Sequence, residues 1–387
     1  MKTKFLGYPR PNEKVGVRNY IAVIPSVSCA ADTAVKIASQ VTGTIVIMNN
    51  TGCDEVDIDL EQTLRTLAGV GRNPNVAATL VIGLGCEVLS PFVLANEIKK
   101  EGKPVECLVI QEIGGTLKTI REGVAIIQRL AGEISMIERK CFDLSRLVIG
   151  TECGGSDATS GLAANPALGA ASDMLVKGGG TSILAETPEM IGAEHWLIRR
   201  AVNREVGERI NFIVKRYEKR LKDIGENFVG KQPCPGNIEG GLSTIEEKSL
   251  GCVAKGGNSR IQGVLEYGEA PSGKGLYIMD TPGNDIEGNS ALIAGGCQII
   301  CFTTGRGNPI GSPIAPVIKI TGNPFTFEGM KDNIDIDAGT IIQGKESIKK
   351  AGLRIFDEII AVASGKQTKA EVLGCREFCI NRLGPSY

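Results

Sequence analysis

The sequence predicts an α/β protein, with a doubly wound parallel-sheet N-terminal domain followed by a second α/β domain. From Asn19 onwards, short runs rich in Val and Ile alternate with helix-like stretches, 50 glycines supply turns, and only 4% of residues are aromatic. Near-continuous apolar strands joined by helices are typical of parallel sheets covered on both faces. Since 387 residues exceed what one core usually organises, we expect two domains, over residues 1–140 and 141–387.

The first domain is predicted from four strand–helix repeats. The expected strands are Tyr20–Val27, Thr44–Met48, Ala78–Leu84 and Val105–Ile110, and the expected helices are Ala30–Gln40, Asp59–Gly69, Pro91–Lys100 and Thr116–Ala131. This alternation predicts one parallel sheet with crossover helices on both faces.

The second domain repeats the pattern less regularly. The expected strands are Leu147–Gly150, Thr181–Ala185, Leu276–Asp280 and Gln298–Phe302, and the expected helices begin at Asn165, Ile286 and Glu346. A single long helix is predicted from about Glu189 to Ile224, with a charged and solvated later part.

Composition excludes several classes of function. Lysine plus arginine (43) balances aspartate plus glutamate (44), which argues against nucleic acid or a membrane surface as a partner. We find no apolar stretch of 18 residues and no basic, apolar leader at Met1–Pro11, so we expect a soluble, cytoplasmic protein. In that setting the 12 cysteines are not expected to form a disulfide framework.

Two strings at predicted strand ends are the main candidates for a functional site. They are Thr151-Glu-Cys-Gly-Gly-Ser-Asp157 and Ala185-Glu-Thr-Pro-Glu-Met-Ile-Gly-Ala-Glu-His195, which ends in the only histidine. Each places carboxylates with a thiol or an imidazole where a strand turns into a helix, so these groups can face one ligand. The glycines of the first string also suit an anion, although a plain tight turn predicts them equally. Glu186 is expected to converge with Glu194 or His195, and the alternative is a histidine that only packs.

Three cysteines offer a second candidate. Cys29, Cys53 and Cys86 each fall just beyond a predicted strand of the first domain, where the carboxyl ends of parallel strands form one edge. Three thiols at this edge could hold iron or an iron–sulfur cluster. The alternative is that cysteine simply fits tight strand–helix turns.

A third turn, Thr303-Thr304-Gly305-Arg306-Gly307, carries a guanidinium that could bind a substrate carboxylate in bidentate fashion. Gly83-Leu-Gly85 lacks the third glycine of a dinucleotide fingerprint, which argues against a nicotinamide site.

Many ordered strings along the chain resemble the altronate/galactarate dehydratase family, which includes the large subunit of sulfolactate sulfo-lyase. The resemblance is carried by Val15-Gly-Val-Arg18-Asn-Tyr20, Gly83-Leu-Gly-Cys86-Glu87, Glu152-Cys-Gly-Gly-Ser-Asp157, Glu186-Thr-Pro-Glu189, Gly192-Ala-Glu-His195, Glu247-Lys-Ser-Leu-Gly251 and Cys301-Phe-Thr-Thr-Gly-Arg-Gly307. It implies a lyase that removes a proton alpha to a carboxylate and a hydroxide or sulfite from the beta carbon, giving a 2-oxo acid. Single-chain members carry an additional small N-terminal domain, so the resemblance also implies a separate small subunit in a homo- or hetero-oligomer.

The resemblance further implies a metal, because the enediolate formed beside a carboxylate needs a cation to stabilise it. We expect Fe²⁺, with Mn²⁺ or an iron–sulfur cluster as alternatives. One histidine cannot build a two-histidine, one-carboxylate site, so either cysteines and carboxylates of this chain hold the iron or the small subunit supplies imidazoles.

These considerations assign roles to named residues. The expected metal ligands are Cys29, Cys53, Cys86, Cys153, Glu152 and Glu186. The expected catalytic residues are His195, Glu194 and Lys248, the last as a base if burial lowers its pKa; the alternative is a surface lysine. The expected substrate contacts are Gly154, Gly155, Ser156, Asp157, Thr303, Thr304 and Arg306.

Overall fold

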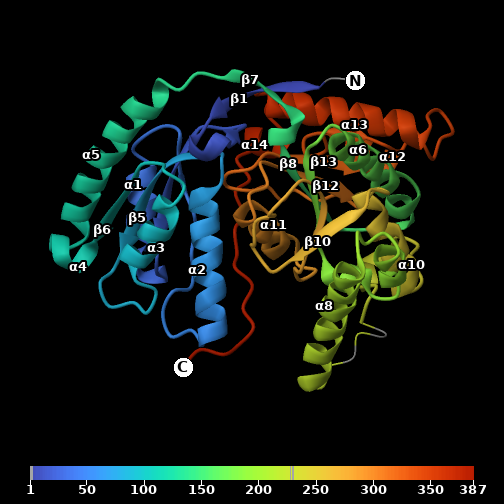
Figure 1. Cartoon of the computed structure of the whole chain (residues 1–387), viewed down its shortest axis with the longest axis horizontal. Helices are drawn as coiled ribbons and strands as arrows, with labels where there is room; N and C mark the ends of the chain where they lie inside the picture. Colours follow the sequence, from blue (N-terminus) through green and yellow to red (C-terminus); the bar gives the residue numbers. More distant parts are fainter. Residues whose placement is uncertain (1–2, 227, 229–230) are drawn as a thin grey trace.

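Each half of the molecule is built on a parallel sheet (Figure 1). The structure is a computed structural model that describes residues 3–226, 228 and 231–387. The first sheet has the order β4-β3-β5-β6 and the second β10-β11-β9-β8-β12-β13-β14, with every pair parallel. This arrangement confirms the predicted α/β class.

The elements of the first half lie close to their predicted positions. The strands are β3 (Tyr20–Pro25), β4 (Thr44–Val46), β5 (Val76–Gly83) and β6 (Val105–Val109). The helices are α1 (Ala31–Ala38), α2 (Asp57–Arg72), α3 (Pro91–Lys99), α4 (Ile110–Ile113) and α5 (Thr116–Ser135).

The second half contains more elements than the sequence pattern predicts. Its strands are β8 (Val148–Cys153), β9 (Thr181–Leu184), β10 (Ile261–Leu265), β11 (Gly275–Met279), β12 (Ile299–Thr304), β13 (Val317–Thr321) and β14 (Ile336–Asp337). Its helices are α6 (Asn165–Lys177), α7 (Glu194–Ile198), α8 (Arg204–Asp223), α9 (Pro235–Glu239), α10 (Ile245–Val253), α11 (Asp285–Ala294), α12 (Pro324–Gly329), α13 (Ile348–Ala363) and α14 (Lys369–Val372).

Each sheet reverses its strand order once. In the first sheet the chain turns back between β3 and β5, and in the second it does so between β8 and β12. Ligands of open parallel sheets bind outside the carboxyl ends of the strands at such reversals. The loops after β8, β9 and β12 are therefore the expected site of the second half.

The predicted single helix from Glu189 to Ile224 is wrong. The chain forms a short 3₁₀ turn at Thr187–Met190, then α7, then α8. Gly192 has a φ of +84°, which ends the turn, and the Asn203 side chain accepts a hydrogen bond from Val206 N to start α8. These local signals outweigh the charge pattern that suggested one helix.

A small antiparallel sheet, β2-β1-β7, was not predicted. It consists of β1 (Lys4–Pro9), β2 (Val15–Gly16) and β7 (Lys140–Asp143), and Phe5 of β1 pairs with Phe142 of β7. The strands are short and far apart in sequence, so no local sequence pattern indicates that they pair.

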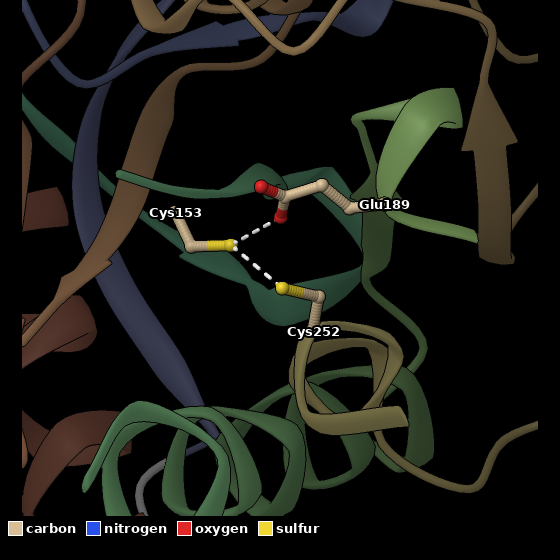
Figure 2. Close-up of side chains that lie close together, drawn as sticks. All are labelled: Cys153, Glu189 and Cys252. Atoms are coloured by element: carbon tan, nitrogen blue, oxygen red, sulfur yellow. Dashed lines mark hydrogen bonds between the residues drawn. The ribbon is translucent and has the colours of Figure 1, made fainter. Parts of the chain in front are cut away.

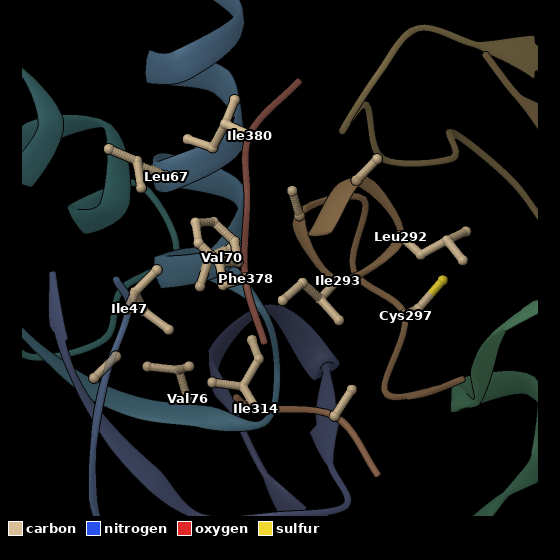
Figure 3. Packing of buried hydrophobic residues seen from close by; sticks show 14 of the residues in the cluster. Ile47, Leu67, Val70, Val76, Leu292, Ile293, Cys297, Ile314, Phe378 and Ile380 are labelled. Carbon is tan, nitrogen blue, oxygen red and sulfur yellow. The ribbon is translucent and has the colours of Figure 1, made fainter. Parts of the chain in front are cut away.

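One hydrophobic core continues across both halves (Figure 3). Leu67 and Val70 of α2 belong to the same cluster as Ile293 of α11 and as Phe378 and Ile380 of the C-terminal tail. The tail runs alongside α2 in Figure 1, and Asp59 of α2 accepts hydrogen bonds from Leu383 N and Gly384 N. The last residues of the chain thus pack against the first half.

Among the described residues, no helix is both long enough and apolar enough to cross a bilayer.

Candidate metal centre

Three carboxylates meet at the carboxyl edge of the second sheet. Glu152 lies near the end of β8, Glu186 follows β9, and Asp285 is the first residue of α11. One oxygen of each lies within 4.8 Å of the others. This is the edge that the reversal of strand order designates for a ligand.

Glycines make room for these carboxylates. A Cβ at Gly154 would lie 2.3 Å from Asp285 Oδ2, and a Cβ at Gly288 would lie 2.6 Å from Glu152 Oε1. Glu186 itself has a φ of +75°, a strained conformation for a residue with a side chain. The backbone is therefore shaped around the three carboxyl groups.

Several of these buried oxygens lack a partner. Glu152 and Glu186 are both 0% exposed, and within the described part of the chain Glu152 Oε1, Glu152 Oε2 and Glu186 Oε1 have no hydrogen bond. An unpaired buried carboxylate is costly, and a bound cation removes that cost. Hard oxygen ligands of this kind suit Mg²⁺, Mn²⁺ or Fe²⁺.

A second group of potential ligands contains two thiols (Figure 2). Cys153 Sγ donates to Glu189 Oε2 over 2.9 Å and lies 3.5 Å from Cys252 Sγ. Cys153 ends β8, Glu189 belongs to the 3₁₀ turn after β9, and Cys252 lies on α10. All three are buried, and one atom from each lies within 4.8 Å of the others. Thiolate ligands favour softer metals than the carboxylate group does.

Two lysines contact the carboxylate group and the thiol group. Lys255 Nζ donates to Glu186 Oε2 over 2.5 Å and to Cys153 Sγ over 3.1 Å, and Lys248 Nζ lies 2.8 Å from Glu189 Oε1.

The charges of this cluster do not balance. Among the described residues, the carboxylates of Glu152, Glu186, Glu189 and Asp285 face two ammonium groups, so full ionisation leaves two negative charges in excess. One divalent cation neutralises that excess. The donor set therefore fits a divalent metal.

The acid–base properties follow from this imbalance. Burial, together with the neighbouring carboxylates, raises the pKa of Glu152 well above its ordinary value, that of Glu186 to about 7 and that of Asp285 to about 6. Burial also opposes ionisation of Glu189, but Lys248 and Lys255 outweigh it and lower the pKa of that carboxyl to about 2. Without a cation the cluster retains protons near neutral pH, and metal binding must displace them.

Two cavities reach the cluster. One of about 510 Å³ is lined by Asp285 with Asn284 and Asn308, and one of about 260 Å³ is lined by Lys248 and Cys252 together with Ser156 and Asp157. Small molecules can thus approach both the carboxylate group and the thiol group.

The structure brings together four of the residues that the sequence singled out, namely Glu152, Cys153, Glu186 and Lys248. The expected lowering of the Lys248 pKa is not found. Burial does favour the neutral amine, but the adjacent Glu189 carboxylate prevails and raises the pKa of Lys248 above its ordinary value. Lys248 is therefore a cation in this cluster and not a neutral base.

The expected convergence of Glu186 with Glu194 or His195 does not occur. His195 is exposed on α7 and lies beside Trp196, with ring centroids 5.8 Å apart and ring planes tilted by 45°, whereas Glu186 is fully buried. Among the described residues, the carboxylates within 4.8 Å of Glu186 are those of Glu152 and Asp285. The position beside Cys153 is taken by Glu189 instead.

Several polar groups of the glycine turn, which were expected to contact a ligand, are hydrogen-bonded within the chain. Gly154 N donates to Thr303 O, and Gly155 O accepts from Arg306 N. Asp157 is buried and accepts from Thr159 N, Ser160 N and Asn323 Nδ2. Among the remaining predicted contacts, Thr303 Oγ1 donates to Asn165 Oδ1, Thr304 Oγ1 accepts from Gly307 N, and Ser156 is buried with its carbonyl bonded to Asn237.

Arg306 does not point at the cluster. Its guanidinium is about half exposed and pairs with Glu239 Oε2 over 2.8 Å and with Gly236 O over 2.6 Å. A role in binding substrate would require it to leave these partners.

Cys29, Cys53 and Cys86 lie at the carboxyl edge of the first sheet, and all three are exposed. Hydrogen bonds join their loops: Ser28 N donates to Thr51 O, and Leu89 N donates to Gly52 O. The ligand groups found within 4.8 Å among the described residues do not include them. Metal binding by these thiols stays a prediction.

Sequence reasoning gave no role to four members of the cluster: Glu189, although it lies in the second candidate string, and Cys252, Lys255 and Asp285. Asp285 is the first residue of the helix that follows β11, so a search of the strand–helix turns could have found it. Cys252 lies on α10 and Lys255 on the turn after it, so neither residue follows a strand.

Comparison with known proteins identifies the family. Residues 144–386 match the family model "D-galactarate/Altronate dehydratase, C-terminal", and residues 7–135 match "D-galactarate dehydratase/Altronate hydrolase, second domain".

Named relatives are similar over nearly the whole chain. (2R)-sulfolactate sulfo-lyase subunit beta of Chromohalobacter salexigens is 38% identical over 98% of this chain and 97% of its own length. Altronate dehydratase of Bacillus subtilis is 36% identical over 98% of this chain and 78% of its own length. Galactarate dehydratase (L-threo-forming) of Escherichia coli is 36% identical over 94% and 73%, respectively. The chain therefore belongs to the D-galactarate/altronate dehydratase family and is a lyase.

Proposed function

We propose that this chain is the catalytic subunit of a lyase that removes water, or sulfite, from the beta carbon of a 2-hydroxy acid such as altronate and yields a 2-oxo acid. One observation carries the proposal: the buried group of Glu152, Glu186 and Asp285, with unpartnered oxygens and excess negative charge, at the reversal of strand order. The names of the relatives, two sugar-acid dehydratases and a sulfo-lyase, support the reaction class.

These three carboxylates would hold a divalent cation, for which Fe²⁺ is our first choice and Mn²⁺ the alternative. When bound, such a cation polarises a substrate carboxylate and stabilises enediolate charge. Asp285 lines the cavity of about 510 Å³, so the hydroxy acid would enter from that side.

Of the two lysines of the cluster, one would donate a proton and the other would balance charge. Lys255 Nζ donates to Cys153 Sγ and Glu186 Oε2, and in our proposal it would donate a proton to the leaving group of a substrate bound at the carboxylates. Lys248 would neutralise Glu189 and keep that carboxylate ionised. Ser156 and Asp157 line the smaller cavity and remain proposed substrate contacts, with Gly154, Gly155, Thr303 and Thr304 as the framework behind them.

A separate small subunit would complete the enzyme. The full-length match to a chain named subunit beta supports this arrangement, since the two dehydratases extend beyond the matched region. His195 is exposed on α7, so it is available to an active site completed by that subunit. The adjacent Glu194 is half-buried, and its Oε2 has no partner among the described residues; it remains a proposed catalytic residue. Arg306 would contribute there if a substrate anion displaced Glu239.

The same coverage favours (2R)-sulfolactate as an alternative substrate. In that case sulfite would leave from the beta carbon in place of hydroxide. The chemistry at the alpha carbon would be unchanged.

An iron–sulfur centre is a candidate of another class. Cys29, Cys53 and Cys86 are exposed on loops that hydrogen bonds hold side by side, which supports binding of a cluster by three thiols. Visible absorption after anaerobic purification tests this directly, because reduced mononuclear iron is nearly colourless.

The decisive experiment is co-expression of this chain with a small subunit from the same genome. The complex is loaded with Fe²⁺ without oxygen and assayed for 2-oxo acid with aldonates, galactarate and sulfolactate, and sulfite release is measured separately. Glu152→Gln should abolish turnover while the circular dichroism spectrum stays unchanged. The matched control is Glu208→Gln on the exposed face of α8. Full activity of Glu152→Gln would refute the proposed centre, and product from no hydroxy acid would refute the proposed reaction.

A further inference from the structure

A third cavity, of about 450 Å³, lies in the seam between the two halves. Arg65, Gly69 and Arg72 of α2 line one side, and the loop around Lys274 lines the other. The cavity also reaches Val148 and Thr181, the first residues of β8 and β9. The carboxylate centre lies toward the opposite ends of these strands, since Glu152 follows Val148 by about 13 Å along β8 at the usual rise of a strand. The two sites are therefore separate.

The lining of this seam cavity carries excess positive charge. It contains five cationic side chains (Lys14, Arg65, Arg72, Arg146 and Lys274) and three acidic ones (Glu13, Glu101 and Glu269). Two of the acids are already paired, Glu101 with Lys14 and Glu13 with Arg146.

The other three cationic side chains have N–H groups that form no hydrogen bond with the described residues. Arg65 uses Nε on Tyr267 O, and Arg72 has only a 3.9 Å contact with Glu97. Within the described residues Lys274 has no ion pair or hydrogen bond, and burial together with Arg146 lowers its pKa. Like charges gathered in this way attract an anion.

The wall of the cavity is open at Gly296. This residue has a φ of +94° and nothing within 4 Å of a Cβ position, so the wall leaves room for a ligand.

We propose that the seam cavity binds a small oxyanion-bearing metabolite, through a phosphate or a carboxylate group. Arg65 and Arg72 hold it from the first half, and Lys274 holds it from the second. Because the ligand touches both halves, its binding strengthens their association. This inference is independent of the lyase reaction and of the metal.

Calorimetric titration of the full-length chain tests the proposal. The probes are inorganic phosphate in one arm and succinate in the other, at low ionic strength, with thermal unfolding measured in parallel. We expect saturable binding of one anion per chain and a rise in melting temperature. The arm that binds more tightly identifies the phosphate or the carboxylate source.

Variants locate the anion. Arg72→Gln and Lys274→Gln should each weaken binding roughly tenfold or more, as the loss of a charge-assisted hydrogen bond predicts. Lys349→Gln, on the exposed side of α13, should change nothing, and Glu152→Gln should bind as well as the wild type.

Absence of saturable binding in both arms would overturn the proposal. So would unchanged binding in Arg72→Gln and Lys274→Gln, whose side chains line the cavity. Loss of binding in Glu152→Gln would place the anion at the carboxylate centre and also refute the seam cavity.

Discussion

At the scale of single residues, the proposed function rests on a buried charge that the described residues do not neutralise. Glu152 has two carboxylate oxygens without partners, while Glu186 and Glu189 each have a lysine. An uncompensated buried charge either binds a cation or takes up a proton. Both outcomes can be measured.

Replacement of Glu152 separates metal binding from folding. Since burial already favours the protonated form of this acid, Glu152→Gln should change the stability of the metal-free protein by no more than about 1 kcal/mol. Stabilisation by Mn²⁺ or anaerobic Fe²⁺, seen as a rise in melting temperature, should disappear. Glu208→Gln should keep that response, and so would Glu152→Gln if the carboxylates do not bind the metal.

The raised pKa of Glu186 predicts a pH dependence of a definite sign. Its folded pKa of about 7 lies above the ordinary value of 4.5, so the protein gains a proton on folding. The stabilising contribution is complete below pH 4.5 and is lost as the pH rises through 7, by at most roughly 3 kcal/mol.

Urea unfolding of the metal-free protein between pH 4.5 and 8 measures this loss. The slope of stability against pH should become shallower in Glu186→Gln, whereas Glu208→Gln should keep the wild-type slope. Identical slopes in all three proteins would show that Glu186 has an ordinary pKa.

At the scale of elements, the two halves meet where α2 crosses α11. A Cβ at Gly69 of α2 would lie 2.4 Å from Ala294 O of α11, so only glycine permits this approach. Asn73, at the end of α2, reinforces the contact by donating to Ile293 O and Cys297 O. The contact positions α11, whose first residue is Asp285.

Gly69→Ala should therefore destabilise the protein, although alanine is the better helix former. Forcing the helices apart is expected to cost about 1–3 kcal/mol. Gly132→Ala on α5 is the matched control, because a Cβ there meets nothing within 4 Å. That change should be neutral or should stabilise by up to about 1 kcal/mol. Chemical denaturation checks both variants, and equal effects would contradict the close helix contact.

At the scale of the whole molecule, the halves share a core and are expected to unfold together. The tail that carries Phe378 and Ile380 inserts between α2 and α11 (Figure 3). A core that crosses the boundary couples the stabilities of the two sheets.

Phe378→Ala should lower the stability of the entire chain by about 3–5 kcal/mol. Calorimetry should show one transition in the wild type and a single transition at lower temperature in the variant. Val372→Ala is the control, since this side chain is 70% exposed at the end of α14. Two independent transitions in the wild type would argue against a shared core.

The sequence by itself determined the order of strands and helices in the first half and the placement of Glu152, Cys153 and Glu186 at strand ends. These features depend on local periodicity and on the rule that parallel strands expose one edge. Tertiary structure alone decided which groups meet there. It brought Cys252, Lys255 and Asp285 to the cluster and left His195 and Arg306 facing outward. The physical reason is that a side chain's partners depend on how distant helices pack and turn. A glycine in a left-handed conformation produces no periodic pattern in the sequence. The same holds for a helix that packs against residues about 100 positions earlier in the chain.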